Sequence, residues 1–156
     1  KYSNPYSIAA HIGLGLLIIS ISLNSQFSSE RAINIKINGD DIYKDYRIKF
    51  DNLELIKMSN HDSVMASFII DSPSGKTFVL NPEKRKYFTR GQITTETAIH
   101  ATPLKDIYVT LGDQLDDGSW IVNIQFNYFI RWIWISALLM AISGSFLAFS
   151  LRGTSR

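Results

Sequence analysis

Two long stretches without charge, one near each end of the chain, constrain its fold more than any other feature. One runs from Ile8 to Leu23 and the other from Trp132 to Leu151, and neither contains an acidic or basic residue. A helix needs about 20 mostly apolar residues to cross the hydrocarbon core of a bilayer. The second stretch meets that length, and Tyr128 and Trp134 lie near its start, where aromatic rings favour a membrane interface. We therefore predict a transmembrane helix there.

The first stretch is shorter and leaves two interpretations. It approaches the length of a membrane span only if Pro5–Ser7 and Asn24 extend it. The alternative is a cleaved secretory signal peptide, but only Lys1 precedes the stretch with a charge, and "SLNSQFSS" has no small-x-small cleavage site. We therefore favour a second membrane span. Because the chain begins with Lys and not Met, we also expect it to be a portion of a longer protein.

The charged residues are unevenly distributed, which predicts how the chain is oriented. All 14 Asp and Glu residues lie between Glu30 and Asp117, whereas Lys1, Arg152 and Arg156 flank the apolar stretches on the side of the chain ends. Basic flanks favour the cytoplasmic side of a membrane, so we expect the long middle segment on the outer side. No continuous basic face is implied, so nucleic-acid binding has no support. The chain has no cysteine and therefore contributes no thiol.

The middle segment has the alternating pattern of β-strands. Apolar and polar residues alternate in "RAINIKIN", "YRIKF", "DIYVTLG" and "SWIVNIQF". Turn signals lie in "NGDD" at 38–41, "SPSG" at 72–75 and "DQLDDG" at 113–118, and the last two predict hairpins. Six or so short strands predict a small antiparallel barrel or sandwich.

The predicted fold class is therefore a membrane protein with two transmembrane α-helices flanking a small antiparallel β domain outside the cytoplasm. We expect three parts along the chain. Residues 1–27 form a transmembrane helix that carries His11, residues 28–127 form the β domain, and residues 128–156 form the second helix and a short cytoplasmic tail.

A basic segment lies between the two predicted hairpins, at residues 81–100. It groups four cations around two aromatic residues: Lys84, Arg85, Lys86, Arg90, Tyr87 and Phe88. One interpretation is a solvated loop, which the charge pattern favours. The other is a site for a carboxylate or phosphate, since guanidinium groups bind such anions in a forked geometry.

Histidine is the other candidate for chemistry. His61 and His100 are isolated, without the neighbours that a hydrolytic triad or a metal site needs. His11 is different because it lies inside an apolar run, where an ionisable group is rare and usually functional. On a helix it shares a face with other small or apolar residues, namely Ser7, Leu14, Gly15, Ile18 and Ser22. Two roles stay open: a hydrogen bond to a neighbouring helix, or axial ligation of a heme iron.

Several motifs, taken in order, resemble the C-terminal part of the CcmF family of cytochrome c-type biogenesis proteins, which are membrane heme lyases. The matching pieces are "AHIGLGLL" at 10–17, "NPEKRKYF" at 81–88, "TTETAI" at 94–99, "DIYVTLGD" at 106–113 and "FIRWIWISALLMAISG" at 129–144. They cover nearly the whole chain and follow the family's layout of helix, outer domain and helix. The tail "FSLRGTSR" is less basic than is usual in the family.

The resemblance implies a b-type heme in the membrane, held between histidines of two helices, with His11 as one axial ligand of the iron. The family's second ligand, its outer tryptophan-rich segment and the two histidines that flank that segment have no counterpart here. The chain would then be the C-terminal portion of the lyase, either truncated or one product of a split gene. Lys84, Arg85 and Arg90 are further candidates, for heme propionates or a partner, although ion pairing with Glu83 or Glu96 is an equal alternative.

The resemblance also implies a reaction and its partners. Heme vinyl groups are joined as thioethers to the two thiols of a CxxCH motif in apocytochrome c, by a complex in which this chain is not active alone. The implied partners are the N-terminal part of the same lyase, a heme chaperone, apocytochrome c and a thiol-handling maturation subunit. The implied location is the inner membrane of a bacterium or mitochondrion, with the long segment on the periplasmic or intermembrane side.

Two alternatives from other classes remain. One is a non-catalytic binding or assembly module anchored in the membrane, for which His11→Ala would cost packing but no pigment. The other is a heme chaperone, which would need an outer histidine or tyrosine to capture heme, and neither His61 nor His100 has a suitable context.

Overall fold

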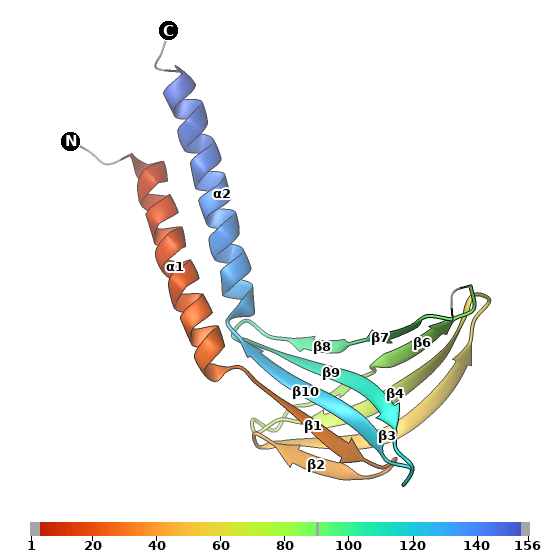
Figure 1. The fold of residues 1–156 in the computed structure, drawn as a ribbon. Helices are drawn as coiled ribbons and strands as arrows, with labels where there is room; N and C mark the ends of the chain where they lie inside the picture. The colour runs from red at the N-terminus through yellow and green to blue at the C-terminus, as the bar shows by residue number, and fades with distance from the viewer. Residues whose placement is uncertain (1–3, 90, 154–156) are drawn as a thin grey trace. The chain divides into compact units, whose positions relative to one another are not determined.

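The computed structural model describes residues 4–89 and 91–153 (Figure 1). The chain forms two compact units. The helical unit consists of Lys1–Ser28, Thr102–Asp106 and Asn127–Arg156, and the β unit consists of Ser29–Ala101 and Ile107–Phe126. The short middle segment of the helical unit was not predicted from the sequence.

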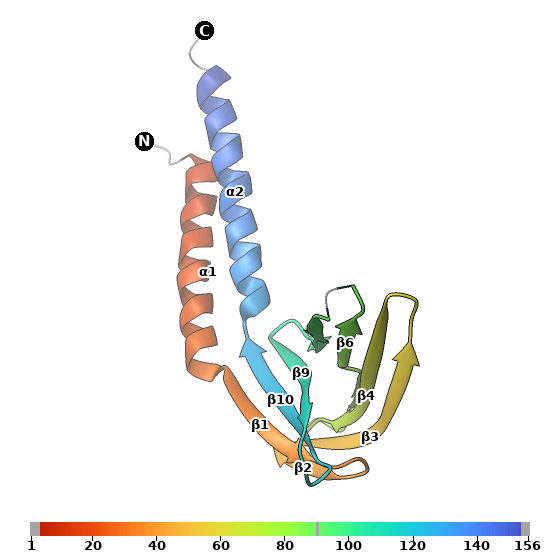
Figure 2. The ribbon, with the colours of Figure 1, turned by 45° about the vertical axis from the view of Figure 1, so that its right-hand side comes forward.

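The helical unit contains two antiparallel helices, α1 (Pro5–Phe27) and α2 (Ile130–Gly153), which lie side by side in both ribbon views (Figures 1 and 2). Helix α1 starts where its sequence favours a start, because Asn4 accepts a hydrogen bond from the Tyr6 N–H and Pro5 occupies the first turn. Both helices are long and apolar enough to cross a membrane. The two predicted helices are therefore present, with ends a few residues beyond the apolar runs.

Small residues form the contact between the two helices. Gly13 and Ser20 of α1 are buried, as are Ser136 and Ser143 of α2. A Cβ atom on Gly13 would lie 2.7 Å from Cγ of Met140. Glycine and serine let two helix backbones approach closely, which is the usual basis of helix association in membranes.

The β unit contains two antiparallel layers (Figure 2). One sheet has the order β1-β10-β9-β8 and the other β2-β3-β4-β6-β7, with β5 also paired to β4. The strands are β1 (Ser29–Ile35), β2 (Asp40–Tyr43), β3 (Tyr46–Lys57), β4 (His61–Asp71), β5 (Thr77–Leu80), β6 (Glu83–Tyr87), β7 (Ile93–Glu96), β8 (Ala98–Ala101), β9 (Lys105–Gln114) and β10 (Trp120–Tyr128). The predicted barrel or sandwich is therefore a sandwich.

The core of the sandwich follows the predicted alternation. The inward residues of both sheets are almost fully buried, among them Ile33, Ile35, Ile48, Phe50, Phe68, Ile107, Val109, Leu111, Val122, Ile124 and Phe126. The rings of Tyr43 and Tyr46 pack on Phe126 with centroids 5.5 and 5.0 Å apart, which joins the two sheets. Both predicted hairpins, β4–β5 and β9–β10, are confirmed.

The alternation in β3 breaks after Phe50 for an identifiable reason. The pairing of β3 with β4 shifts between Phe50 and Asn52, which leaves Asp51 as an extra residue. Such a β-bulge reverses the faces on which later side chains lie. The predicted turn at 38–41 is also shorter than expected, since Asp40 already begins β2.

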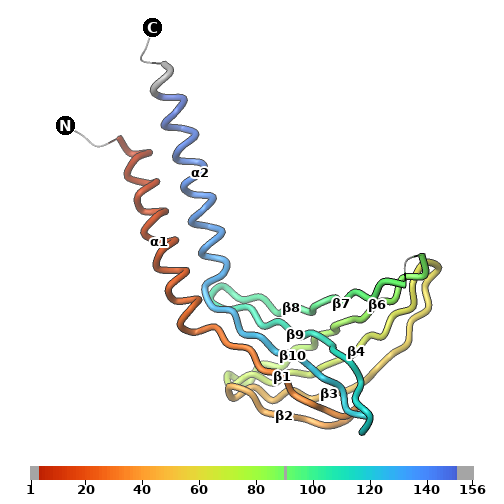
Figure 3. The backbone as a smooth tube through the Cα atoms, viewed as in Figure 1, coloured from red at the N-terminus to blue at the C-terminus, as the bar shows by residue number. Residues whose placement is uncertain are grey.

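The basic segment at 81–100 is not a solvated loop, and that interpretation was wrong. Residues on both sides of Arg90 form β6, β7 and β8, and in the tube view β7 and β8 follow one another along the chain (Figure 3). Strand β6 pairs with β4 on one side and β7 on the other. Pairing between distant strands supplies the backbone hydrogen bonds here, so the charged side chains did not prevent strand formation.

Candidate functional site

His11 lies in the second turn of α1, and its own helix holds the imidazole ring. Its Nδ1 lies 2.6 Å from the backbone oxygen of Ser7. A carbonyl oxygen only accepts hydrogen bonds, so Nδ1 must carry the proton. In the tautomer that carries its only proton on Nδ1, the lone pair lies on Nε2. This is the form in which histidine ligates a metal, oriented by a hydrogen bond from the other ring nitrogen.

The side of α1 that carries His11 is open. His11 and Ile18 are exposed, and an added Cβ on Gly15 would meet no atom within 4 Å. The contact with α2 is made by Gly13 and Ser20, on another side of the helix. Within residues 4–89 and 91–153, the hydrogen bond of the His11 ring is to its own helix and not to α2, so the alternative of a hydrogen bond to a neighbouring helix does not apply to α2.

His61 and His100 are held by ordinary contacts in the β unit. Nδ1 of His61 lies 2.8 Å from Oδ1 of Asn60, and its ring packs near Tyr87. His100 stacks on Phe78 with ring centroids 3.7 Å apart. No group of three His, Cys, Asp or Glu side chains that could hold a metal ion occurs among the described residues.

Two basic side chains of β6, Lys84 and Arg85, are paired with carboxylates of the same unit. Arg85 donates to Glu83 at 2.7 Å and lies 3.5 Å from Glu96, so the ion-pairing alternative holds for this residue. Lys84 donates to the carboxylate of Asp113 on β9. Arg90 lies outside the described residues. The sequence left a site for an external anion open as one alternative, and the fold places carboxylates of the chain itself next to Lys84 and Arg85.

The cluster around Arg85 has a clear electrostatic effect. The hydrogen bond from Arg85 is the main reason that the pKa of Glu83 falls from 4.5 to about 2, and a hydrogen bond from the Ser63 hydroxyl acts in the same direction. In turn, Glu83 raises the pKa of Arg85 further above its usual range. These groups are fixed in their charged forms at neutral pH and serve the β unit as an ion-pair network.

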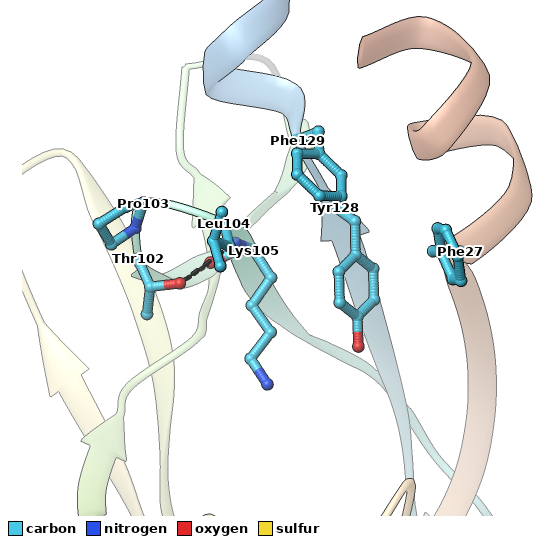
Figure 4. A pocket seen from close by; sticks show the side chains of 7 residues that line it. All are labelled: Phe27, Thr102, Pro103, Leu104, Lys105, Tyr128 and Phe129. Carbon is cyan, nitrogen blue, oxygen red and sulfur yellow. Dashed lines mark hydrogen bonds between the residues drawn. The ribbon is translucent and has the colours of Figure 1, made fainter. Parts of the chain in front are cut away.

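The helical unit contains a pocket that the sequence did not reveal (Figure 4). It has a volume of about 550 Å³ and is lined by Phe27, the turn Thr102–Lys105, Tyr128 and Phe129. We call this turn the junction turn. The dipeptide Pro103–Leu104, placed between two strand patterns, was the only available signal for it.

Several hydrogen bonds tie the junction turn and the helix ends together. Phe129 donates its N–H to the Leu104 carbonyl at 2.8 Å, and the Trp132 indole donates to the Pro103 carbonyl at 3.0 Å. Asn24 donates its side-chain amide to the carbonyl of Tyr128 at 2.6 Å. Thr102 closes the turn by donating its hydroxyl to the Lys105 carbonyl.

Comparisons with known proteins agree with this architecture. The family described as "CcmF C-terminal beta-sandwich" matches residues 26–127. The chain is 33% identical over 150 residues to "Cytochrome c-type biogenesis protein CcmF" of Escherichia coli strain K12, which covers 96% of this chain and 23% of that protein. It is 32% identical over 143 residues to the protein of that name in Pseudomonas aeruginosa, covering 92% and 22%.

A solved structure gives the same result for the fold. "Cytochrome c Heme Lyase CcmF" matches with a TM-score of 0.71 at 12% identity, over 88% of this chain and 23% of that one. The chain thus spans less than a quarter of the length of these relatives. With the motif order, the paired helices and the sandwich in agreement, the resemblance is confirmed, and the chain belongs to the CcmF C-terminal family.

Proposed function

We propose that this chain is the C-terminal part of a membrane heme lyase for cytochrome c maturation, and that His11 is an axial ligand of a b-type heme in the membrane. The chain's family and the names of its relatives support a role in cytochrome c biogenesis. The observation that carries the ligand assignment is the geometry at His11: an Nδ1–H bonded to the Ser7 carbonyl and an exposed ring on an unpacked side of α1.

The residues around His11 fit a flat macrocycle. With its proton on Nδ1, the imidazole ring has a lone pair on Nε2 that can bind iron. Gly15, one turn along the same side of the helix, leaves open space beside the ring. A bound heme would supply an iron that changes oxidation state, with a potential that the axial ligand tunes. The chain's own contribution is to fix the ring tautomer and hold the space open.

We further propose that both helices span the inner membrane and that the segment between them lies on the periplasmic or intermembrane side. The length and apolarity of α1 and α2 support this, as do the basic residues near the chain ends. Of those residues, Lys1 and Arg156 lie outside the described residues. The proposed division into residues 1–27, 28–127 and 128–156 follows from this arrangement.

The proposed reaction joins heme vinyl groups to the two thiols of a CxxCH motif in apocytochrome c. The client carries these thiols and a thiol-handling subunit prepares them, which suits a chain that has no cysteine of its own. The N-terminal part of the lyase would supply the second heme ligand, and a heme chaperone would deliver the substrate heme. This chain is then one part of the enzyme and is not active alone.

Lys84 and Arg85 are weaker candidates for propionate or partner contacts. Asp113 and Glu83 already pair with them, so an incoming anion would have to displace a carboxylate of the chain. Arg90 keeps its place as a candidate from the sequence alone.

The first experiment is a reduced-minus-oxidised absorption spectrum of the chain purified with its N-terminal part. His11→Gly is expected to lose the low-spin b-type signal, and added imidazole is expected to restore it, because free imidazole can occupy the space that the side chain leaves. Ser22→Ala on the same side of α1 is the control and should keep the signal. A spectrum unchanged in His11→Gly would contradict the ligand assignment, and no heme in the wild type would favour an anchored binding module.

A second experiment tests the open side of α1. Gly15→Leu is expected to reduce heme content at least severalfold, because its side chain would enter the space beside His11. Gly144→Leu is the matched control, since an added Cβ there also meets nothing within 4 Å, but on α2. Equal heme content in the two variants would contradict heme binding beside Gly15.

A further inference from the structure

The junction turn belongs to the helical unit although it lies between two strands of the β unit. Residues Thr102–Asp106 group with the two helices. The turn is bonded to the start of α2 by the Phe129 N–H and the Trp132 indole, and Asp106 lies 3.3 Å from Arg131. The turn is therefore held as a fixed part of the helix ends.

The exposed side chains at this place are large and apolar. Leu104 is 57% exposed and Phe27 is 50% exposed, and both line the pocket. Water does not favour such a surface, and a contiguous exposed apolar patch usually marks an interaction site. Something apolar is expected to cover it.

The polar tips around the pocket share one direction. Figure 4 shows the Lys105 ammonium group and the Tyr128 hydroxyl both reaching away from the helix ribbons, while Phe129 lies beside the start of α2. Long amphipathic side chains adopt this arrangement at a membrane surface, where the apolar body lies in the acyl region and the polar tip reaches the headgroups.

We propose that the junction turn and Phe27 form a wedge that inserts into the outer interface of the bilayer, and that phospholipid acyl chains fill the pocket. This inference rests on the proposed membrane span. The pocket continues the apolar outer surfaces of α1 and α2, at the end where α1 stops and α2 starts. A membrane that surrounds those helices would reach the pocket without any further partner.

The lengths of the helices are consistent with this position. With 23 residues, α1 is about 34 Å long at 1.5 Å per residue, against about 30 Å for the hydrocarbon core. The junction then lies where acyl chains meet headgroups.

The wedge can be tested with single-cysteine labelling, because the chain has no cysteine of its own. Leu104→Cys and Phe27→Cys would each be labelled with an environment-sensitive fluorophore in the chain reconstituted in phospholipid nanodiscs. Quenching by lipids with a nitroxide near the headgroup or deep in the acyl chain then reports depth. Ile18→Cys, 57% exposed on α1, is the deep control, and Leu55→Cys, 78% exposed in the β unit, is the control outside the helical unit. Circular dichroism checks the fold of each variant.

We expect both wedge positions to be quenched by the shallow nitroxide at least threefold more than Leu55→Cys, and Ile18→Cys to be quenched best by the deep one. If Ile18→Cys is quenched and either wedge position matches Leu55→Cys, the wedge is overturned while the membrane span stands. If Ile18→Cys is not quenched, the membrane span fails and the wedge fails with it.

Discussion

The two units of this protein are built in opposite ways. The helical unit buries Gly13 and small polar side chains such as Ser136, and it exposes Ile18, Leu138 and other large apolar residues. The β unit instead has a core of large apolar side chains such as Phe68, Ile48 and Val109, and its ion pairs lie outside that core. The same chain thus follows two opposite rules of burial.

The contrast supports the proposal that the two units lie in different solvents. In water, burial of large apolar side chains stabilises the fold, as in the sandwich. In lipid that force is absent, and helices associate through close packing of small residues and hydrogen bonds. The inverted burial of the helical unit is therefore an independent argument for the membrane span that we propose.

The largest expected effect is the difference between removing a buried side chain of the β unit and removing an exposed one of the helical unit. Phe68→Ala empties a fully buried site in the sandwich and is expected to lower the free energy of unfolding by about 3–5 kcal/mol. Ile18→Ala removes an exposed side chain of α1 and should cost less than about 1 kcal/mol in lipid. Urea denaturation in nanodiscs measures both: Trp120 fluorescence reports on the β unit after Trp132 and Trp134 are replaced by phenylalanine, and helical circular dichroism of the chain with all three tryptophans reports on the helical unit. Similar losses of unfolding free energy in the two variants would contradict the idea that the two units follow opposite rules of burial.

The contact between the helices is the next test. Gly13→Leu would collide with Met140 and is expected to weaken helix packing by about 1–3 kcal/mol. Cross-linking of a Tyr6→Cys/Phe146→Cys pair reports this packing, because the two rings stack with centroids 5.6 Å apart. Gly15→Leu and Gly144→Leu should leave the cross-linking yield unchanged, since both positions are open. A drop in the cross-linking yield of all three variants would mean that Gly15 and Gly144 also lie in contacts between the helices.

Polar contacts inside the helical unit should have a smaller effect. Asn24→Ala removes the hydrogen bond to the Tyr128 carbonyl and is expected to cost about 0.5–1.5 kcal/mol. Amide hydrogen exchange at the start of α2 should rise about two- to tenfold, the equivalent of that free energy. Gln26→Ala, on an exposed neighbour, is the control and should show no such rise. If amide exchange in Asn24→Ala were unchanged, the hydrogen bond from Asn24 to the Tyr128 carbonyl would not stabilise the start of α2.

The smallest effect concerns the charged exterior of the β unit. Because Arg85 lowers the pKa of Glu83 from 4.5 to about 2, ionised Glu83 stabilises the fold above pH 4.5, and this contribution is lost as the pH falls toward 2. Glu83→Gln should lower stability at pH 7 by up to about 1 kcal/mol, a typical value for a salt bridge at a surface, and flatten the pH dependence between 4.5 and 2. Urea midpoints at pH 7, 4.5 and 3 measure this, with the exposed Glu30→Gln as the control. An unchanged slope in Glu83→Gln would contradict the ion-pair network.

The sequence predicted much of the fold because patterns of apolar residues along the chain determine the helices and several of the strands. The apolar runs predicted both helices, and period-2 alternation predicted the inward residues of β1, β9 and β10. The segment at 81–100 was missed because its strands depend on tertiary pairing: β6 pairs with β4 and β8 pairs with β9, while β7 pairs with β6. The charge run favoured a solvated loop because the sequence did not show that Asp113 and Glu83 pair with Lys84 and Arg85.

The candidate site divides in the same way. The sequence alone determined that an imidazole lies in an apolar helix with a glycine one turn away, since helical periodicity fixes that spacing. Only the tertiary structure decided that α2 packs on Gly13 and leaves His11 outside the contact, because helix packing depends on the shapes of two surfaces. It also decided that the junction turn joins the helical unit, through hydrogen bonds between groups that are far apart along the chain.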